Sequence, residues 1–255
     1  MISFGIDIGS VSTKAVLMDG NTLLDKEVVF SGYNTAQTAL ELYNNILHRN
    51  GLESIDKQHI AATGYGRKIV GFAGNIITEI TCHAKGAYFL NPSIRTVVDI
   101  GGQDSKVIAL DETGNVRDFI MNDKCAAGTG RFLEVMARAL EVDLATFAEI
   151  SLLSSKPVEI SSICTVFAES EVVSSIAKGN NRMDIAAGIH NSVASRVLSM
   201  AKRVSIQPEI MMTGGVAKNK AVVRALEKLL GKTIIVNELA QFTGAIGAAL
   251  IAHGK

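Results

Sequence analysis

The chain contains an internal repeat, and this repeat restricts the folds that it can adopt. "DIGSVSTKAVLMD" at residues 7–19 aligns without gaps on "DIGGQDSKVIALD" at residues 99–111, with five of thirteen positions identical and a constant offset of 92 residues. Each copy follows an apolar strand, turns at glycine, enters a second apolar strand and ends at a turn signal. The repeat therefore predicts two lobes, each of which opens with a strand-turn-strand hairpin.

Strand and helix patterns alternate along the rest of the chain and predict an α/β protein. Further strands are expected at residues 22–30, 59–64, 115–121 and 209–215. Helices are expected at residues 34–50, 82–90, 128–140, 165–179, 183–204 and 240–252. With only three prolines and no low-complexity tract, the two lobes are expected to be closely joined.

The balance of charges excludes several classes of partner. Lys and Arg total 25, as do Asp and Glu, so no overall field favours nucleic acid or an anionic membrane. The first ten residues lack a basic region and include Asp7, which argues against a signal peptide or a membrane-spanning helix. Three cysteines are too few, and odd in number, for a disulfide framework. We expect a cytoplasmic protein whose cysteines are spare thiols, catalytic groups or metal ligands.

The two glycine turns indicate a nucleotide cleft between the lobes. Backbone N–H groups at such turns are able to point at phosphate oxygens from both sides. Asp7 and Asp99 lie at equivalent strand ends and are candidates to hold Mg²⁺ through water. Lys14 and Lys106 also match, although their charge alone does not aim them at phosphate. One Asp-x-Gly turn would be no more than a tight turn, but two at a fixed offset favour nucleotide binding.

Several motifs together resemble a known family. "GIDIGSVSTK", "DIGGQDSK" and "MTGGV" are similar to the two phosphate loops and the adenosine loop of the actin, hexokinase and heat-shock chaperone ATPase superfamily. With "ATGYGR", "NDKCAAGTGRF" and "CTVFAESE" added, the chain resembles, almost end to end, the ATP-dependent activators of 2-hydroxyacyl-CoA dehydratases, which are BcrAD/BadFG-type ATPases. The ATPase subunits of benzoyl-CoA reductases are also similar.

The resemblance implies two actin-like (ribonuclease H-like) lobes with ATP and Mg²⁺ between them. Lobe I is expected at residues 1–92 plus 238–255, and lobe II, with the cluster cysteines, at residues 93–237. Family members often have a hydroxyl residue at the position of Val11, so Ser12 or Thr13 is expected to replace that contact. The residues implied to bind the nucleotide are Gly9, Ser10, Ser12, Thr13, Lys14, Gly101, Gly102, Gln103, Gly214, Gly215, Val216 and Gln241.

The resemblance further implies a homodimer that shares one 4Fe-4S cluster, bound by Cys125 and Cys164 of each chain. The residues themselves also favour ligation, since both cysteines precede predicted helices, whose N-terminal ends lower thiol pKa values. A cluster takes four thiolates, and a twofold axis would supply the second pair. From the residues alone, a cluster, a shared zinc ion and spare thiols all remain open. Cys82, beside His83, lacks a matching partner and is expected to be a packed thiol.

The function implied by the resemblance is ATP-driven electron transfer. Such an activator receives an electron from a reduced ferredoxin or flavodoxin and passes it to a dehydratase or a related iron-sulfur protein. Gln103 and Asp104 are candidates to orient the attacking water, while Glu169 and Glu171 are expected to make interlobe or interface contacts. Arg67 in "GYGR" is expected to help dock a lobe or a partner. The alternatives are a benzoyl-CoA reductase ATPase subunit and an actin-like small-molecule kinase without a cluster.

Overall fold

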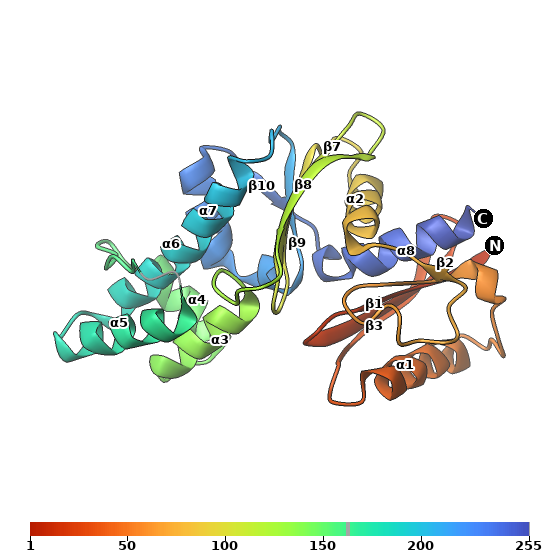
Figure 1. The fold of residues 1–255 in the computed structure, drawn as a ribbon, viewed down its shortest axis with the longest axis horizontal. Helices are drawn as coiled ribbons and strands as arrows, with labels where there is room; N and C mark the ends of the chain where they lie inside the picture. Colours follow the sequence, from red (N-terminus) through yellow and green to blue (C-terminus); the bar gives the residue numbers. More distant parts are fainter. Residues whose placement is uncertain (162–163, 255) are drawn as a thin grey trace.

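Two five-stranded sheets of the same topology form the framework of the molecule (Figure 1). The computed structural model describes residues 1–161 and 164–254. The first sheet has the order β3-β2-β1-β4-β5, with β1 (Ile2–Ile8), β2 (Ser12–Asp19), β3 (Thr22–Phe30), β4 (Ile60–Thr63) and β5 (Asn75–Ile76). The second has the order β8-β7-β6-β9-β10, with β6 (Thr96–Ile100), β7 (Ser105–Leu110), β8 (Val116–Asn122), β9 (Ile210–Thr213) and β10 (Ile234–Val236). The predicted two-lobed α/β fold is confirmed.

The internal repeat occupies equivalent registers in the two sheets. Asp7 of β1 pairs with Lys14 of the antiparallel strand β2, and Asp99 of β6 pairs with Lys106 of β7. On the other side of each central strand, Asp7 lies opposite Thr63 of β4 and Asp99 lies opposite Thr213 of β9. Each sheet therefore has an aspartate and a lysine from the repeat, and a threonine from the neighbouring parallel strand, at the same three positions.

Helices cover both faces of each sheet (Figure 1). They are α1 (Thr35–Arg49), α2 (Glu79–Leu90), α3 (Gly130–Ala139), α4 (Leu144–Leu152), α5 (Thr165–Ala177), α6 (Arg182–Ala201), α7 (Lys220–Leu230) and α8 (Thr243–His253). Side chains alternate across each strand, so Leu17 of β2 shares a buried cluster with α1 while the next residue, Met18, packs against α8. In the same way, Met212 of β9 joins the cluster with α3 to α7, and Met211 packs with α2.

Helices α2 and α8 lie between the two sheets and touch each other through glycines (Figure 1). A Cβ atom on Gly86 would lie 2.0 Å from the carbonyl oxygen of Thr243, and one on Gly247 would lie 1.8 Å from that of Cys82. Only glycine permits this approach of the two backbones. Helix α2, which precedes the second sheet in the chain, packs on that sheet. Helix α8, which follows the second sheet in the chain, packs on the first sheet.

Each helix and strand expected from the sequence is present, with ends shifted by a few residues. The sequence patterns missed helices α4 and α7 and the short strands β5 and β10. Within the described residues, no helix is long and apolar enough to cross a membrane.

Candidate functional site

A cavity of about 1120 Å³ lies between the two β-hairpin turns and is lined from both lobes. Thr13 was expected in this site, but its side chain is fully buried behind the wall, with Oγ1 3.0 Å from Oγ of Ser31. The other residues expected to bind a nucleotide all line the cavity. They are Gly9, Ser10, Ser12, Lys14, Gly101, Gly102, Gln103, Gly214, Gly215, Val216 and Gln241.

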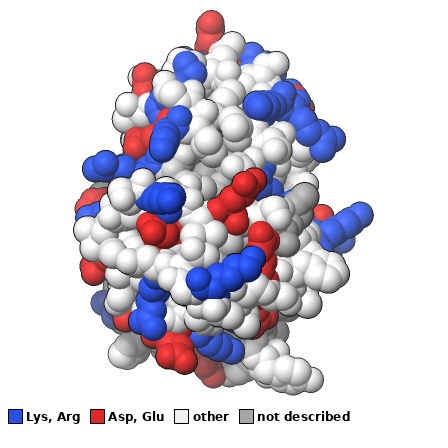
Figure 2. Space-filling view, turned by 90° about the vertical axis from the view of Figure 1, so that its left-hand side faces the viewer, with Lys and Arg blue, Asp and Glu red and all other residues white. Residues whose placement is uncertain are grey.

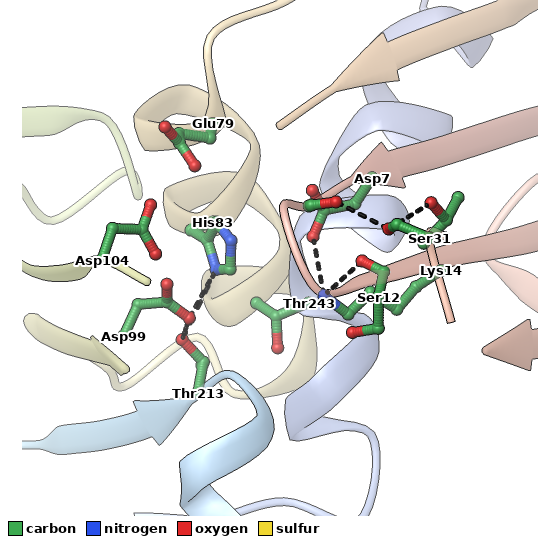
Figure 3. Close-up of polar contacts among 12 residues, drawn as sticks. Asp7, Ser12, Lys14, Ser31, Glu79, His83, Asp99, Asp104, Thr213 and Thr243 are labelled. Carbon is green, nitrogen blue, oxygen red and sulfur yellow. Dashed lines mark hydrogen bonds and ion pairs between the residues drawn. The ribbon is translucent and has the colours of Figure 1, made fainter. Parts of the chain in front are cut away.

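In the first lobe, the charged residues of the repeat are loosely held (Figure 3). Lys14 Nζ donates a hydrogen bond to the carbonyl oxygen of Ser12 at 3.1 Å and lies 4.0 Å from Asp7 Oδ2. The turn itself is closed by the Gly9 N–H, which donates to the same carbonyl at 3.2 Å. Lys14 is therefore anchored near the turn without a close carboxylate partner.

In the second lobe, the equivalent lysine is locked among carboxylates. Lys106, which is 2% exposed, has its Nζ 3.0 Å from Asp99, 2.8 Å from Asp104 and 3.2 Å from Glu79. Burial acts to lower the pKa of Lys106, but the three carboxylates outweigh it and raise that pKa. Burial likewise acts to raise the pKa of Asp99, yet His83 and Lys106 lower it. Both groups stay charged, and the cluster is a closed ion-pair network.

The two aspartates differ in what they offer a metal ion. Asp99 Oδ1 accepts a hydrogen bond from Thr213 at 2.8 Å and lies 3.3 Å from His83 Nδ1, and its Oδ2 bonds to Lys106. Asp7 has only the distant Lys14 as an ion-pair partner among the described residues. Within the described part of the chain, no group of three or more His, Cys, Asp or Glu side chains is placed to hold a metal ion. Asp7 is thus the better candidate for water-mediated Mg²⁺ binding, and both assignments stay predictions.

Glu79 is a cleft residue that the sequence analysis missed. It is the first residue of α2, follows the capping residue Thr78, and its carboxylate lines the cavity opposite Asp104 (Figure 3). Burial raises its pKa, and Lys106 offsets part of that shift. The sequence signal at this position is a helix start with an acid in its first turn, which says nothing about the cleft.

The two predicted water-orienting residues have different surroundings. Gln103 is exposed at the turn between β6 and β7 and lines the cavity. The carboxylate of Asp104 also lines the cavity but is paired with Lys106 at 2.8 Å. Both assignments stay predictions, with Gln103 the freer of the two side chains.

Val11 contributes an apolar contact between the two turns. A Cβ atom on Gly102 would lie 2.5 Å from Val11 Cγ2, so the turn of the first lobe touches that of the second. Of the two hydroxyl residues expected to replace a hydroxyl at Val11, Ser12 lines the cavity and Thr13 does not. Val11 therefore supplies an apolar contact across the cleft at a position where the resemblance implied a hydroxyl residue.

One wall of the cavity is apolar and belongs to the second lobe. Helix α4, which the sequence patterns missed, is central to this wall. The apolar side chains that line it are Leu133, Leu144, Ala145, Ala148, Leu152 and Val216. A flat apolar surface of this kind beside the Gly214–Gly215 loop suits a purine base, which buries its faces while its edges form hydrogen bonds.

Two free thiols lie in the second lobe, one at the start of a helix and the other in the loop before a helix. Cys164 is the exposed N-cap residue of α5, and its side chain makes no capping hydrogen bond. Cys125 is half-buried in the loop that leads to α3, which packs against α5. The N–H groups at these helix ends favour a bound anion or thiolate. Two thiols of one chain fit half of the ligand set of a 4Fe-4S cluster.

The third thiol has a different environment. Cys82 is fully buried on α2, and burial raises its pKa to about 12, so it remains protonated. As expected from the sequence, it is a packed thiol. Glu171 accepts a hydrogen bond from the backbone N–H of Ser161 at 3.0 Å, and its expected interlobe or interface contact stays a prediction.

The surface next to Cys164 is apolar. Val166 and Phe167, the residues that follow Thr165 at the start of α5, are each 67% exposed, and Val173 is 55% exposed. Figure 2 shows this end of the molecule, where charges of both signs are scattered over an otherwise uncharged surface. Because neither positive nor negative charge predominates on this surface, it would not repel a second copy of the chain electrostatically.

Relatives of known name share the whole length of the chain. The sequence profile of the BadF/BadG/BcrA/BcrD ATPase family matches residues 4–252. The activator of lactoyl-CoA dehydratase from Anaerotignum propionicum is 50% identical over 256 residues, which cover 99% of this chain and 98% of the relative. A more distant relative, one of the subunits of benzoyl-CoA reductase from Thauera aromatica, is 33% identical, with 98% of this chain and 92% of the relative covered.

Solved structures share the fold. Component A of the (R)-2-hydroxyglutaryl-CoA dehydratase from Acidaminococcus fermentans matches with a TM-score of 0.93 and 47% identity, covering 100% of this chain and 98% of that one. The activator of the 2-hydroxyisocaproyl-CoA dehydratase from Clostridium difficile, solved with bound ADPNP, matches with a TM-score of 0.93 and 45% identity, covering 100% and 95%.

Proposed function

The chain belongs to the BadF/BadG/BcrA/BcrD ATPase family, and on this premise we propose that it hydrolyses ATP to deliver a low-potential electron to a 2-hydroxyacyl-CoA dehydratase. Its relatives include activators of such dehydratases and one component of a benzoyl-CoA reductase. In this proposal the protein is a homodimer that shares one 4Fe-4S cluster. A reduced ferredoxin or flavodoxin is the proposed electron donor.

The observation that carries the proposal is a direct backbone link between the nucleotide cleft and the thiol loop. The N–H groups of Gly130 and Arg131, which begin α3, donate to the carbonyl oxygens of Gly101 and Gly102 at 2.9 Å each. The same helix start follows the loop that carries Cys125. Because the phosphate turn and α3 share hydrogen bonds, a movement of the turn on ATP binding is expected to move α3 and this loop as well.

The lining of the cleft suggests how ATP is bound. The adenine base packs on the apolar wall of α3 and α4 beside Gly214 and Gly215, and the phosphates lie between the two hairpin turns. Lys14 faces a phosphate, since it lacks a close carboxylate, and Asp7 holds Mg²⁺ through water. Asp99 and Lys106 stabilise the second lobe through their ion pair.

For hydrolysis, we propose that Gln103 and Glu79 orient the attacking water. Gln103 is exposed in the turn beside the phosphates, and the Glu79 carboxylate reaches the cleft from α2, where burial raises its pKa and makes it a stronger base. Asp104 is proposed to hold Lys106 and Glu79 in position through its ion pair.

Replacement of either water-orienting residue tests this assignment. We expect Glu79→Gln and Gln103→Ala each to lower kcat for ATP hydrolysis by about 100-fold, while the Kd for ATP changes by less than about threefold. Steady-state phosphate release and equilibrium ATP binding give the two numbers. The exposed Glu53 serves as a control, since Glu53→Gln should retain wild-type turnover. If a variant hydrolyses ATP at the wild-type rate, the residue that it replaces does not orient the attacking water.

The cluster assignment rests on the thiols and the surface beside them. Cys125 and Cys164 are free and precede helices that pack together, and Cys164 lies next to an exposed apolar stretch at Val166 and Phe167. A second copy of the chain would cover that stretch and complete a set of four thiolates. A 4Fe-4S cluster supplies a one-electron couple at such a site.

Anaerobic purification and metal analysis test the cluster assignment. We expect a brown dimer with about four irons, which Cys125→Ser and Cys164→Ser should each abolish while ATP binding is retained. Cys82→Ala is the matched control, because this buried thiol is expected to leave the iron content unchanged. Full iron content in either serine variant would falsify the ligand assignment. Zinc at the dimer interface would instead indicate a nucleotide-dependent regulatory protein.

The partner is tested by ATP-dependent activation. The reduced protein with ATP should activate a 2-hydroxyacyl-CoA dehydratase, and candidates that differ in their acyl-CoA substrates identify which one. The similarity to a component of benzoyl-CoA reductase makes that reductase the second candidate. A colourless, air-stable protein that phosphorylates a sugar would instead be an actin-like kinase.

A further inference from the structure

A fourth loop reaches the cleft from the first lobe, in addition to the two hairpin turns and the Gly214–Gly215 loop. Strand β4 ends at Thr63 and is followed by Gly64, just as β9 ends at Thr213 and is followed by Gly214, and the two glycines have positive φ angles of 86° and 85°. The segment that follows Gly214 lines the cavity with Gly215, Val216, Lys218, Asn219 and Lys220. The loop that follows Gly64 lines it with Tyr65, Arg67 and Lys68.

This fourth loop is packed tightly against the end of β1. A Cβ atom on Gly64 would lie 2.4 Å from Asp7 Oδ1, and one on Gly66 would lie 2.5 Å from Ile8 Cγ2. The N–H of Gly66 donates to the carbonyl oxygen of Ile8 at 2.9 Å. Because both glycines are in close contact with β1, the loop holds Arg67 in a defined place beside Asp7.

Arg67 has a fixed side chain but no anionic partner. It is half-buried, and its Nη1 donates to the carbonyl oxygen of Gly64 at 2.9 Å. Among the described residues, no carboxylate lies within 4.0 Å of its guanidinium, whereas Arg49 and Arg131 both have carboxylate partners. A half-buried guanidinium whose remaining donors face a cleft is suited to bind phosphate, which matches its planar set of N–H groups.

We propose that Arg67 binds the terminal phosphate of the nucleoside triphosphate, an inference that rests on the proposed ATP site. The base is expected on the opposite wall, in the second lobe, so the end of the ligand that reaches Asp7 and the fourth loop is the terminal phosphate. ADP lacks this group and therefore lacks the contact. Arg67 gives the first lobe a contact that differs between ATP and ADP, as any nucleotide-driven change of lobe angle requires.

Nucleotide binding to Arg67→Gln and Arg67→Lys tests the inference. In calorimetric titrations with ADPNP and ADP, we expect Arg67→Gln to raise the Kd of ADPNP by about 10- to 100-fold and that of ADP by less than about threefold. Arg67→Lys should fall between this variant and the wild type, since it keeps the charge but loses the planar donors. Lys57→Gln is the control, because Lys57 is a first-lobe cation that also donates to a backbone carbonyl, that of Gly71, outside the cavity lining.

Different results overturn different parts of the argument. If Arg67→Gln binds ADPNP as tightly as the wild type, or weakens ADP by the same factor, Arg67 does not contact the terminal phosphate. If Lys57→Gln causes an equal loss, a general positive field explains the effect, and the inference is wrong. If the wild type binds neither nucleotide, the proposed ATP site fails and the inference with it. Thermal unfolding of each variant verifies that it is folded.

Discussion

The two copies of the internal repeat share a backbone but differ in the freedom of their charged groups. In the first lobe, Lys14 is 4.0 Å from Asp7 and otherwise donates to a backbone carbonyl. In the second lobe, Lys106 lies within 3.2 Å of three carboxylates, one of them Asp99. The same sequence signature therefore produces an open pair in one lobe and a closed network in the other.

The neighbours of each copy explain this difference. Asp104, which completes the network in the second lobe, aligns with the uncharged Ser12 in the first. Helix α2 brings Glu79 to the second copy, whereas α8 brings Gly244 to the first, close to Asp7. A repeated turn reproduces backbone geometry, while the elements packed around it determine which charges are available to a ligand.

Replacement of each of the two lysines should give the largest measurable difference between the lobes. Lys106→Met leaves Asp99, Asp104 and Glu79 without their shared cation in a buried site, and we expect the free energy of unfolding to fall by about 3–5 kcal/mol. Lys14→Met should lower it by less than about 1 kcal/mol and weaken ATP binding instead. Denaturant unfolding of both variants measures the difference. Equal losses of stability would show that the first-lobe lysine is also part of a structural network.

The acid dependence of stability should reveal the ion pair of Asp99 in the second lobe. Because the pKa of Asp99 in the folded protein is below its ordinary value, the ionised form stabilises the fold above about pH 4, and this contribution is lost as the pH falls through the folded pKa. We expect Asp99→Asn to lower stability by about 1–3 kcal/mol at pH 7 and to flatten its decrease below about pH 4. Denaturant unfolding of the wild type and this variant over a range of pH measures this decrease, and an equally steep acid loss in Asp99→Asn would contradict the role of this ion pair.

The threonines opposite the aspartates should show the smallest difference. Thr213 Oγ1 donates to Asp99 at 2.8 Å, while the buried hydroxyl of the equivalent Thr63 makes no such bond to Asp7. We expect Thr213→Val to lower the free energy of unfolding by about 1 kcal/mol and Thr63→Val to leave it nearly unchanged. Thermal or denaturant unfolding would detect this difference. A larger loss in Thr63→Val would mean that its hydroxyl stabilises the first lobe as Thr213 stabilises the second.

Much of the fold follows from patterns that are local in the sequence. The two hairpins, the long helix α6 and the buried strand β9 have strong periodic or apolar signals, and all were predicted. Helix α4 has a weaker stripe and was missed, although Asp143 caps it through the N–H of Thr146. The strands β5 and β10 are two and three residues long, and such short pairings form only because a neighbouring strand is already in place.

The site residues that lie in the glycine turns themselves were predictable from the sequence. The site residues that other segments bring to the cleft were less predictable. The glycines of the phosphate turns were found because a turn needs them. Glu79 was missed as a cleft residue, since the sequence of its own segment indicates only a helix start. For Arg67, the sequence favoured the docking of a lobe or a partner over phosphate binding. The division at residue 92 stays a prediction, because α2, which ends just before it, packs on the second sheet.

The sequence by itself determined the repeated hairpins, the paired Asp and Lys positions, the two thiols at helix starts and the family. These features depend on a few neighbouring residues, whose backbone preferences and spacing are visible in the chain. Only the tertiary structure showed that Lys106 is held by three carboxylates and that Asp7 has no close ion-pair partner among the described residues. It also showed that Arg67 lines the cleft. The energies of those charged groups depend on distances between segments far apart in the chain, and packing of the two lobes around α2 and α8 sets those distances.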